Sequence, residues 1–149
     1  MKQRIYLDTS VISLHDDPRS PDRRAMTQEF WRRIAEFDAS ISDVTTREIA
    51  DTPDPARRAQ MLQLIDGLPV ISSTQEAEQL ARRYLDREIL PEAAPDDALH
   101  VAIAVLSRQD ALVSWNFKHL VNQRRRTAID ALNVSIGLPT ISILPPPEL

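Results

Sequence analysis

Short apolar and β-branched runs alternate along the chain with longer stretches in which apolar residues recur at helical spacing. The short runs lie at residues 4–7, 39–42, 69–72, 111–114 and 140–144. We predict these runs as strands and predict helices at 22–38, 54–66, 74–90 and 96–108, with a last helix ending at Gly137. Because strands alternate with helices, the pattern predicts an α/β fold in which helices flank both faces of a parallel sheet.

The predicted helices differ in how their apolar residues are arranged. Residues 96–108 are apolar nearly all round, as expected of a helix that packs on a sheet and is covered on its outer side. In the first two helices the apolar residues share one face: Met26, Phe30, Ile34 and Phe37, then Met61, Leu62, Leu64 and Ile65. Prolines cannot continue a strand ladder, so we expect the Pro-rich tail at 145–149 to lie extended on the surface.

Length and composition indicate an ordinary globular protein. The 149 residues are 42% hydrophobic and 27% charged, and we expect a single domain spanning 1–149. No stretch approaches the roughly 20 apolar residues of a membrane helix, and the first residues lead into a strand rather than a signal-peptide core. The absence of cysteine excludes disulfides and thiolate metal sites and permits an intracellular home, so we expect a cytoplasmic protein with no membrane contact.

Charge and glycine content exclude several function classes. With a formal net charge of −4, a nucleic-acid role needs a local basic patch, and Lys118 with Arg124–Arg126 is the candidate. The chain has two glycines, and neither a GxGxxG motif nor a P-loop is present. Rossmann dinucleotide binding and P-loop NTPase activity are therefore disfavoured.

Polar residues follow the predicted strands where an α/β sheet forms its sites. Asp8 ends the first strand, and Asn116 follows the fourth. Taken singly, each candidate has an ordinary structural interpretation. Asp8 suits a helix N-cap, Glu48 a solvated helix face, the Asp96–Asp97 pair a first helical turn, and Asn116 a turn. Their order along the chain is what favours a shared site.

Four motifs carry a family resemblance: "YLDTSVIS", "SDVTTREI", "DDALHVAIA" and "VSWNFKHL". In them the chain resembles the PIN-domain nucleases, especially the VapC-type toxins of bacterial toxin–antitoxin pairs, from residue 4 to about residue 144. The resemblance implies a PIN-like domain with a parallel sheet of four or five strands. It also implies a metal-dependent endoribonuclease, with RNA as substrate and with an antitoxin and a second copy of the chain as partners.

By this resemblance Asp8, Glu48 and Asp97 match the acidic metal-site positions. Asp8 and Asp97 are the expected direct ligands, and Glu48 is expected to orient or deprotonate the attacking water. The fourth position is usually acidic in the family but is Asn116 here, which contributes no charge. Asp96 is kept as a neighbour, with Thr9 and Ser10 expected to hold Asp8 in place.

Electrostatics favours a cation independently of the family. Two carboxylates about 5 Å apart repel by roughly 3 kcal/mol at an effective dielectric of about 20. Oxygen ligands without a histidine or cysteine cluster favour Mg²⁺, or Mn²⁺, over zinc. The three histidines lack ligand-like spacing. We expect His100 to be packed and hydrogen-bonded, and His119 is left out of the catalytic set.

Two rival functions are phosphoaspartyl chemistry, which the sequence disfavours, and RNA or protein binding without cleavage. A phosphoaspartyl phosphatase needs a second aspartate two residues after Asp8, where Ser10 stands, and a receiver domain needs an acidic pair and a late lysine that are not convincingly present. A degenerate PIN domain that binds RNA or a protein without cutting is favoured only by Asn116. Trp31 lies about 100° around the helix from Phe30, so it is either a half-buried edge residue or part of a dimer or antitoxin surface.

Overall fold

The computed structural model describes all residues from Met1 to Leu149. Five strands form one sheet in the order β3-β2-β1-β4-β5, and every pair is parallel. The strands are β1 Arg4–Leu7, β2 Asp38–Ser42, β3 Val70–Ile71, β4 Ala111–Val113 and β5 Ser142–Leu144. The predicted parallel α/β sheet is confirmed, with strand ends shifted by one or two residues.

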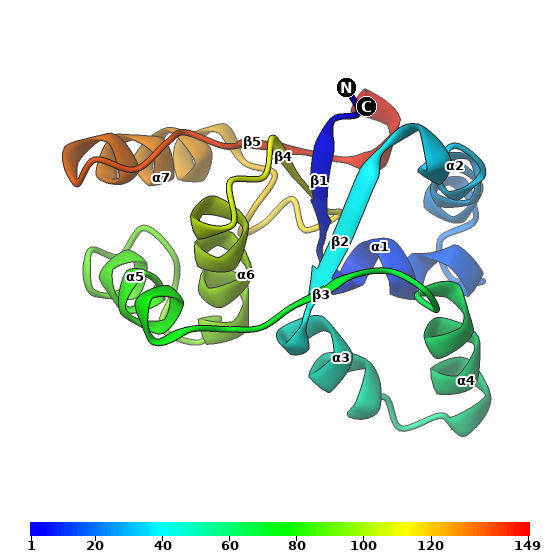
Figure 1. Cartoon of the computed structure of the whole chain (residues 1–149). Helices are drawn as coiled ribbons and strands as arrows, with labels where there is room; N and C mark the ends of the chain where they lie inside the picture. The colour runs from blue at the N-terminus through cyan, green and yellow to red at the C-terminus, as the bar shows by residue number, and fades with distance from the viewer.

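Helices cover both faces of this sheet, as expected. In Figure 1, α5, α6 and α7 lie on one side of the strands and α1 to α4 on the other. The α-helices are α1 Thr9–Ser13, α2 Pro21–Arg32, α3 Asp43–Ala50, α4 Pro55–Leu64, α5 Gln75–Asp86, α6 Pro95–Leu106 and α7 Gln123–Ser135. Three short 3₁₀ turns are η1 Leu14–Asp16, η2 Ile34–Glu36 and η3 Pro146–Glu148. None of the helices is long and apolar enough to span a membrane.

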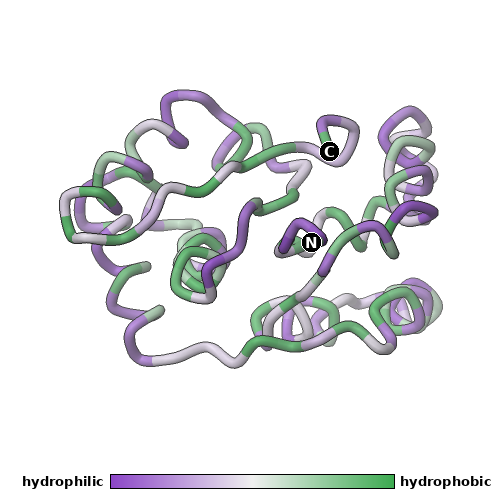
Figure 2. Tube along the Cα trace, turned by 45° about the horizontal axis from the view of Figure 1, so that its top comes forward, coloured by the Kyte–Doolittle hydropathy of each residue, from purple (hydrophilic) through white to green (hydrophobic).

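Alternation along the strands builds a core on each face. In β1, Ile5 and Leu7 face α1 to α4, whereas Tyr6 faces α5 to α7, because successive side chains of a strand point to opposite faces. Helix α6 is buried along most of its length, as its sequence predicts. Figure 2 shows hydrophobic and hydrophilic residues alternating along the outer helices. In α5, for example, Ala77, Leu80, Ala81, Tyr84 and Leu85 are buried.

Helix ends account for most differences from the sequence prediction. Helix α2 stops at Arg32 because the chain turns through η2 into β2, whose Asp38 pairs with Arg4. Helix α5 stops at Asp86, and Glu88 adopts a left-handed φ of 57°. At the end of α7 the prediction was close, since Gly137 has a φ of 80° just past the last turn.

Two packing predictions were wrong. Met26 and Leu62, grouped with the apolar helix faces, do not pack with them and are 38% and 48% exposed. The tail does not lie extended on the surface: it forms η3, in which Pro146 is buried. The Leu149 side chain packs against the α1–α4 core, and its carbonyl accepts a hydrogen bond from Arg33.

Candidate functional site

The strand order reverses direction between β1 and β4, since the chain extends the sheet to β2 and β3 on one side and returns to β4 and β5 on the other. At such a switch point the loops after the two central strands part and leave room for a site. Asp8 directly follows β1, and Ser114 to Asn116 follow β4.

Asp8 is held by three hydrogen bonds. Its Oδ1 accepts from the Thr9 N–H at 2.8 Å, and its Oδ2 accepts from the hydroxyls of Ser10 at 2.8 Å and Ser114 at 2.7 Å. Asp8 is thus the N-cap of α1, as one interpretation of the sequence predicts, and this bonding is compatible with its predicted place in the site. Ser10 supports Asp8 as expected, whereas Ser114 was not foreseen, because its role depends on the neighbouring strand.

Glu48 reaches the same place from α3. Its Oε1 accepts a hydrogen bond from the Thr9 hydroxyl at 2.8 Å and lies 2.5 Å from His100 Nε2. Its side chain is 31% exposed. Thr9 therefore supports Glu48 with its side chain and Asp8 with its backbone.

His100 is the centre of the cluster, a role that the sequence interpretation missed. It is fully buried and hydrogen-bonded, as expected, but its Nε2 faces two site residues, Glu48 at 2.5 Å and Asp8 Oδ1 at 3.6 Å. Its Nδ1 lies 2.5 Å from the Tyr6 hydroxyl, which lies 2.6 Å from Ser42 Oγ. The available signal was its position three residues after Asp97, one helical turn along α6.

Asp97 opens the first turn of α6 and meets the loop after β4. Its Oδ2 accepts hydrogen bonds from Asn116 Nδ2 at 3.1 Å and pairs with His119 Nδ1 at 2.8 Å. His119, set aside as a surface residue, therefore touches a proposed ligand. Asp96 instead pairs with Arg47 at 2.6 Å on the exposed surface, outside this network.

Burial and charge shift three pKa values in the cluster. Burial raises the pKa of Asp97, and the Asp8 charge adds to this, while the His119 hydrogen bond opposes it. Burial lowers the pKa of His100, but the Glu48 hydrogen bond and the Asp8, Glu48 and Asp97 charges outweigh it, so the net pKa is raised. Burial likewise raises the pKa of Tyr6, which stays protonated. A protonated His100 places a positive charge 2.5 Å from Glu48 and 3.6 Å from Asp8.

Whether the acidic side chains could bind a metal ion depends on their arrangement and on their chemistry. No group of three or more histidine, cysteine, aspartate or glutamate side chains is arranged to hold a metal ion as it stands. The donor set nevertheless fits a hard divalent cation, because three carboxylates share one histidine as countercharge. Glu48 Oε2 and Asp97 Oδ1 make no hydrogen bond within the chain and are free to bind. Asp8 and Asp97 are the candidate ligands.

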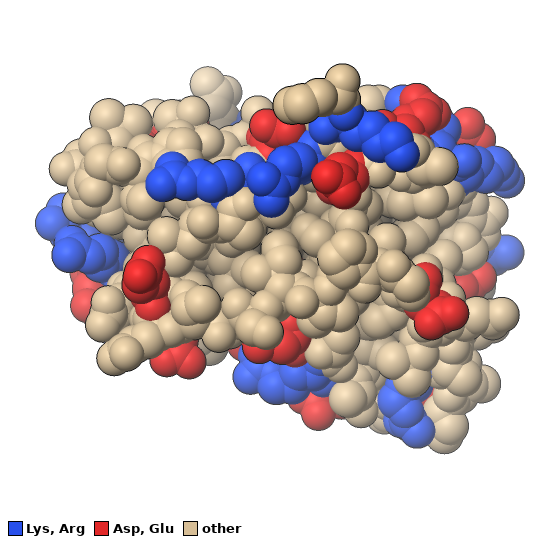
Figure 3. All heavy atoms as spheres, in the orientation of Figure 1, with Lys and Arg blue, Asp and Glu red and all other residues tan.

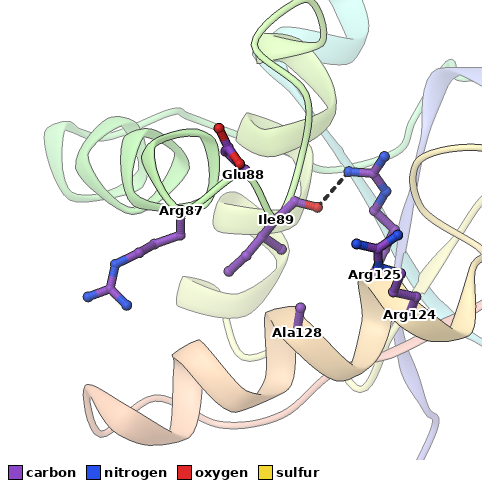
Figure 4. A pocket seen from close by; sticks show the side chains of 6 residues that line it. All are labelled: Arg87, Glu88, Ile89, Arg124, Arg125 and Ala128. Atoms are coloured by element: carbon purple, nitrogen blue, oxygen red, sulfur yellow. Dashed lines mark hydrogen bonds between the residues drawn. The ribbon is translucent and has the colours of Figure 1, made fainter.

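The developed surface hollows lie elsewhere. That the three carboxyl groups line one pocket stays a prediction, and the hollows described on the surface are lined by other residues. One hollow of about 280 Å³ is lined by basic side chains between α5 and α7. Figure 4 shows that Arg87 points away from Arg124 and Arg125, so the cations do not converge. Figure 3 shows basic and acidic groups interspersed over one face of the molecule.

Comparison with known proteins places the fold. No family model matches the sequence, and no curated protein matches it significantly. Among solved structures, VapC20 of Mycobacterium tuberculosis, a sarcin–ricin-loop cleaving toxin, matches with a TM-score of 0.61 at 14% identity, over 77% of this chain and 92% of its own. The chain has the fold of the VapC toxins.

Two further VapC-fold structures cover nearly the whole chain. One belongs to VapBC2 of Rickettsia felis bound to promoter DNA, with a TM-score of 0.59, 15% identity and coverage of 96% of this chain and 98% of that one. The other belongs to DNA-bound VapBC of Salmonella typhimurium, with a TM-score of 0.56, 19% identity and coverage of 98% and 99%. The fold implied by the four sequence motifs is confirmed.

Proposed function

We propose that this protein is a metal-dependent endoribonuclease and the toxin of a bacterial toxin–antitoxin pair. The observation that supports the proposal is that His100 contacts Glu48 and Asp8 after β1, while Asp97 contacts Asn116 after β4, at the switch point of a VapC-type sheet. RNA as the substrate class is supported by VapC20, which cleaves the sarcin–ricin loop.

The proposed cofactor is Mg²⁺, with Mn²⁺ as its substitute, held by Asp8 and Asp97. When bound, such a cation lowers the pKa of water and offsets negative charge on the phosphate. Hydrolysis joins the water oxygen to phosphorus and breaks a P–O bond to the ribose. Glu48 Oε2 is free to take the proton of that water, because His100 and Thr9 hold Oε1. Asn116 orients Asp97 through its amide.

Cleavage assays test this assignment. Purified protein should cut single-stranded or structured RNA with Mg²⁺ or Mn²⁺, and a chelator should stop it. Asp8→Asn and Asp97→Asn should lose nearly all turnover while staying folded by circular dichroism. Asp96→Asn is the matched control and should stay active, because Asp96 pairs with Arg47 outside the network. Undiminished cleavage by both site variants contradicts the proposal, and metal-independent RNA binding without cutting favours a degenerate PIN domain.

The proposed partners are a cognate antitoxin and a second copy of the chain, in the cytoplasm. The VapBC complexes support the antitoxin.

Trp31 is only partly buried, and its indole N–H donates to the Val11 carbonyl at 3.0 Å. It lines a hollow of about 420 Å³ with His15 and Leu64. Trp31→Ala should weaken dimerisation or antitoxin binding by roughly 2 kcal/mol, measured by sedimentation and binding assays. Unchanged values in both return Trp31 to ordinary packing.

A further inference from the structure

Phe117 is an aromatic side chain left open to solvent beside the acidic cluster. It is 42% exposed and directly follows Asn116, whose amide contacts Asp97. Its other neighbour in sequence, Lys118, is also exposed. A single ring among polar groups suits one flat ligand group better than a protein interface, whose centre is a broader apolar patch.

The loop that carries Phe117 is fixed by its own hydrogen bonds. The Asn116 carbonyl accepts from Leu120 N at 3.0 Å and Val121 N at 2.8 Å, and the Asn116 side chain accepts from His119 N at 2.9 Å. The Phe117 N–H donates to the Trp115 carbonyl at 3.0 Å. The backbone that carries the ring is therefore held in place before any contact, which lowers the entropy cost of binding.

Arg23 brings a positive charge to the same ring. Its guanidinium carbon lies 5.0 Å from the Phe117 ring centroid and 5.4 Å from that of Trp115. Arg23 is exposed and makes no ion pair. Trp115 is buried and anchors α2 to the loop, because its indole N–H donates to the Thr27 hydroxyl at 2.8 Å. The unpaired Arg23 guanidinium thus lies against the exposed Phe117 ring, and the buried Trp115 fixes the loop beneath them.

We propose that Phe117 and Arg23 form a platform for an unpaired base of single-stranded RNA, next to the bond that the acidic cluster cuts. The base stacks on the Phe117 ring, and the Arg23 guanidinium contacts a neighbouring phosphate. The Trp115 backbone N–H donates to Ser10 Oγ at 2.9 Å, and Ser10 holds Asp8, so platform and cluster are one connected unit. The proposal rests on the proposed function for its ligand, RNA.

Fluorescence anisotropy with the full-length Asp97→Asn protein separates binding from cutting. The probe is a short fluorescein-labelled single-stranded RNA of mixed sequence, compared with a blunt duplex of the same sequence. Adding Phe117→Ala should weaken single-strand binding about tenfold or more, and Arg23→Gln should weaken it less. Phe117→Trp should restore binding, and its added tryptophan fluorescence should be quenched by the RNA. Val134→Ala is the matched control, because Val134 is 63% exposed on α7.

Equal affinities for Phe117→Ala and Phe117→Trp overturn the platform, and so does an equal loss for duplex and single strand. A shifted sedimentation coefficient in Phe117→Ala with unchanged RNA affinity assigns the ring to a contact between copies and also overturns it. Phe117-dependent binding by a protein that cuts no RNA supports the platform and removes the nuclease assignment. Cleavage by the wild type, with RNA binding that does not depend on Phe117, supports the nuclease assignment and overturns the platform.

Discussion

The candidate site contains two carboxylate–histidine pairs, and they differ in the burial and the hydrogen bonding of the histidine. In the Glu48–His100 pair the ring is fully buried and both of its nitrogens have partners, Glu48 and Tyr6. In the Asp97–His119 pair the histidine is 21% exposed, and only Nδ1 is bonded. The His100 ring is therefore part of the fold, whereas the His119 ring lies at the rim of the cluster; among the carboxylates, Glu48 at 31% is more exposed than Asp97 at 19%.

The difference shows how one histidine can stabilise the fold while leaving its carboxylates available. His100 offers positive charge to three acids but hydrogen-bonds to only one oxygen of Glu48. The net charge of the cluster stays negative even with His100 protonated. A buried histidine can therefore keep the acids together without completing their neutralisation, which leaves room for a cation.

The largest expected contrast is in stability. His100→Ala removes a buried ring and leaves the Tyr6 hydroxyl and Glu48 without their partner, so it should lower the free energy of unfolding by about 3 kcal/mol. Urea unfolding in the absence of divalent metal measures this. A loss no greater than that of His119→Ala contradicts the comparison.

A second contrast tests whether the buried His100 positions Glu48. Tyr6→Phe and Tyr84→Phe each remove a buried hydroxyl, bonded to His100 and Ser42 in one case and to Asn133 in the other. Both should cost about 1–2 kcal/mol in unfolding free energy. Only Tyr6→Phe should also lower the rate of RNA cleavage at saturating substrate. Tyr6, unlike Tyr84, is linked to Glu48 by hydrogen bonds through His100. Equal cleavage by the two variants removes the positioning role.

The pH dependence of stability should separate the two pairs. The pKa of His100 is raised above its ordinary value of 6.5, so its contribution is fully present below pH 6.5 and is lost as pH rises through the folded pKa. The pKa of Asp97 is raised above 3.8, so the folded state loses stability as pH rises from 3.8 through the folded pKa. In unfolding titrations, His100→Asn should remove the loss of stability that begins above pH 6.5. Asp97→Asn should remove the loss that begins above pH 3.8. If the wild type becomes more stable as pH rises above 6.5 and His100→Asn does not, the predicted contribution of His100 is contradicted.

The smallest effect is expected at the rim. His119→Ala removes a partly exposed pair and should cost about 0.5 kcal/mol of unfolding free energy. Thermal unfolding beside the wild type measures it. A cost approaching that of His100→Ala places His119 in the fold rather than at its edge.

The sequence predicted the sheet well because strands and helices follow local periodicity. It also brought Asp8, Glu48, Asp97 and Asn116 forward, because each stands at a recognisable place in a motif. Helix ends such as that after Asp86 were placed less well, since a left-handed residue at Glu88 has no glycine to announce it.

The supporting residues were harder to predict from the sequence. Ser114 reaches Asp8 across 106 residues, and Tyr6 reaches His100 across 94. Such contacts depend on strand order, which only the folded chain reveals. His100 was correctly expected to be packed and bonded, but a histidine in an apolar helix carries no local sign of which partners it meets. The Pro-rich tail was misjudged for the same reason, because the surface that receives Pro146 comes from elsewhere in the chain.

The proposed function depends on the acidic cluster around His100 binding one or more divalent cations through Asp8 and Asp97. Isothermal titration of Mn²⁺ or Mg²⁺ into the RNA-free protein tests it directly, with Asp97→Asn and Asp96→Asn run in parallel. We expect saturable binding by the wild type and by Asp96→Asn, and its loss in Asp97→Asn with the fold intact. Wild-type protein that binds no cation, or Asp97→Asn that binds as tightly as the wild type, contradicts it.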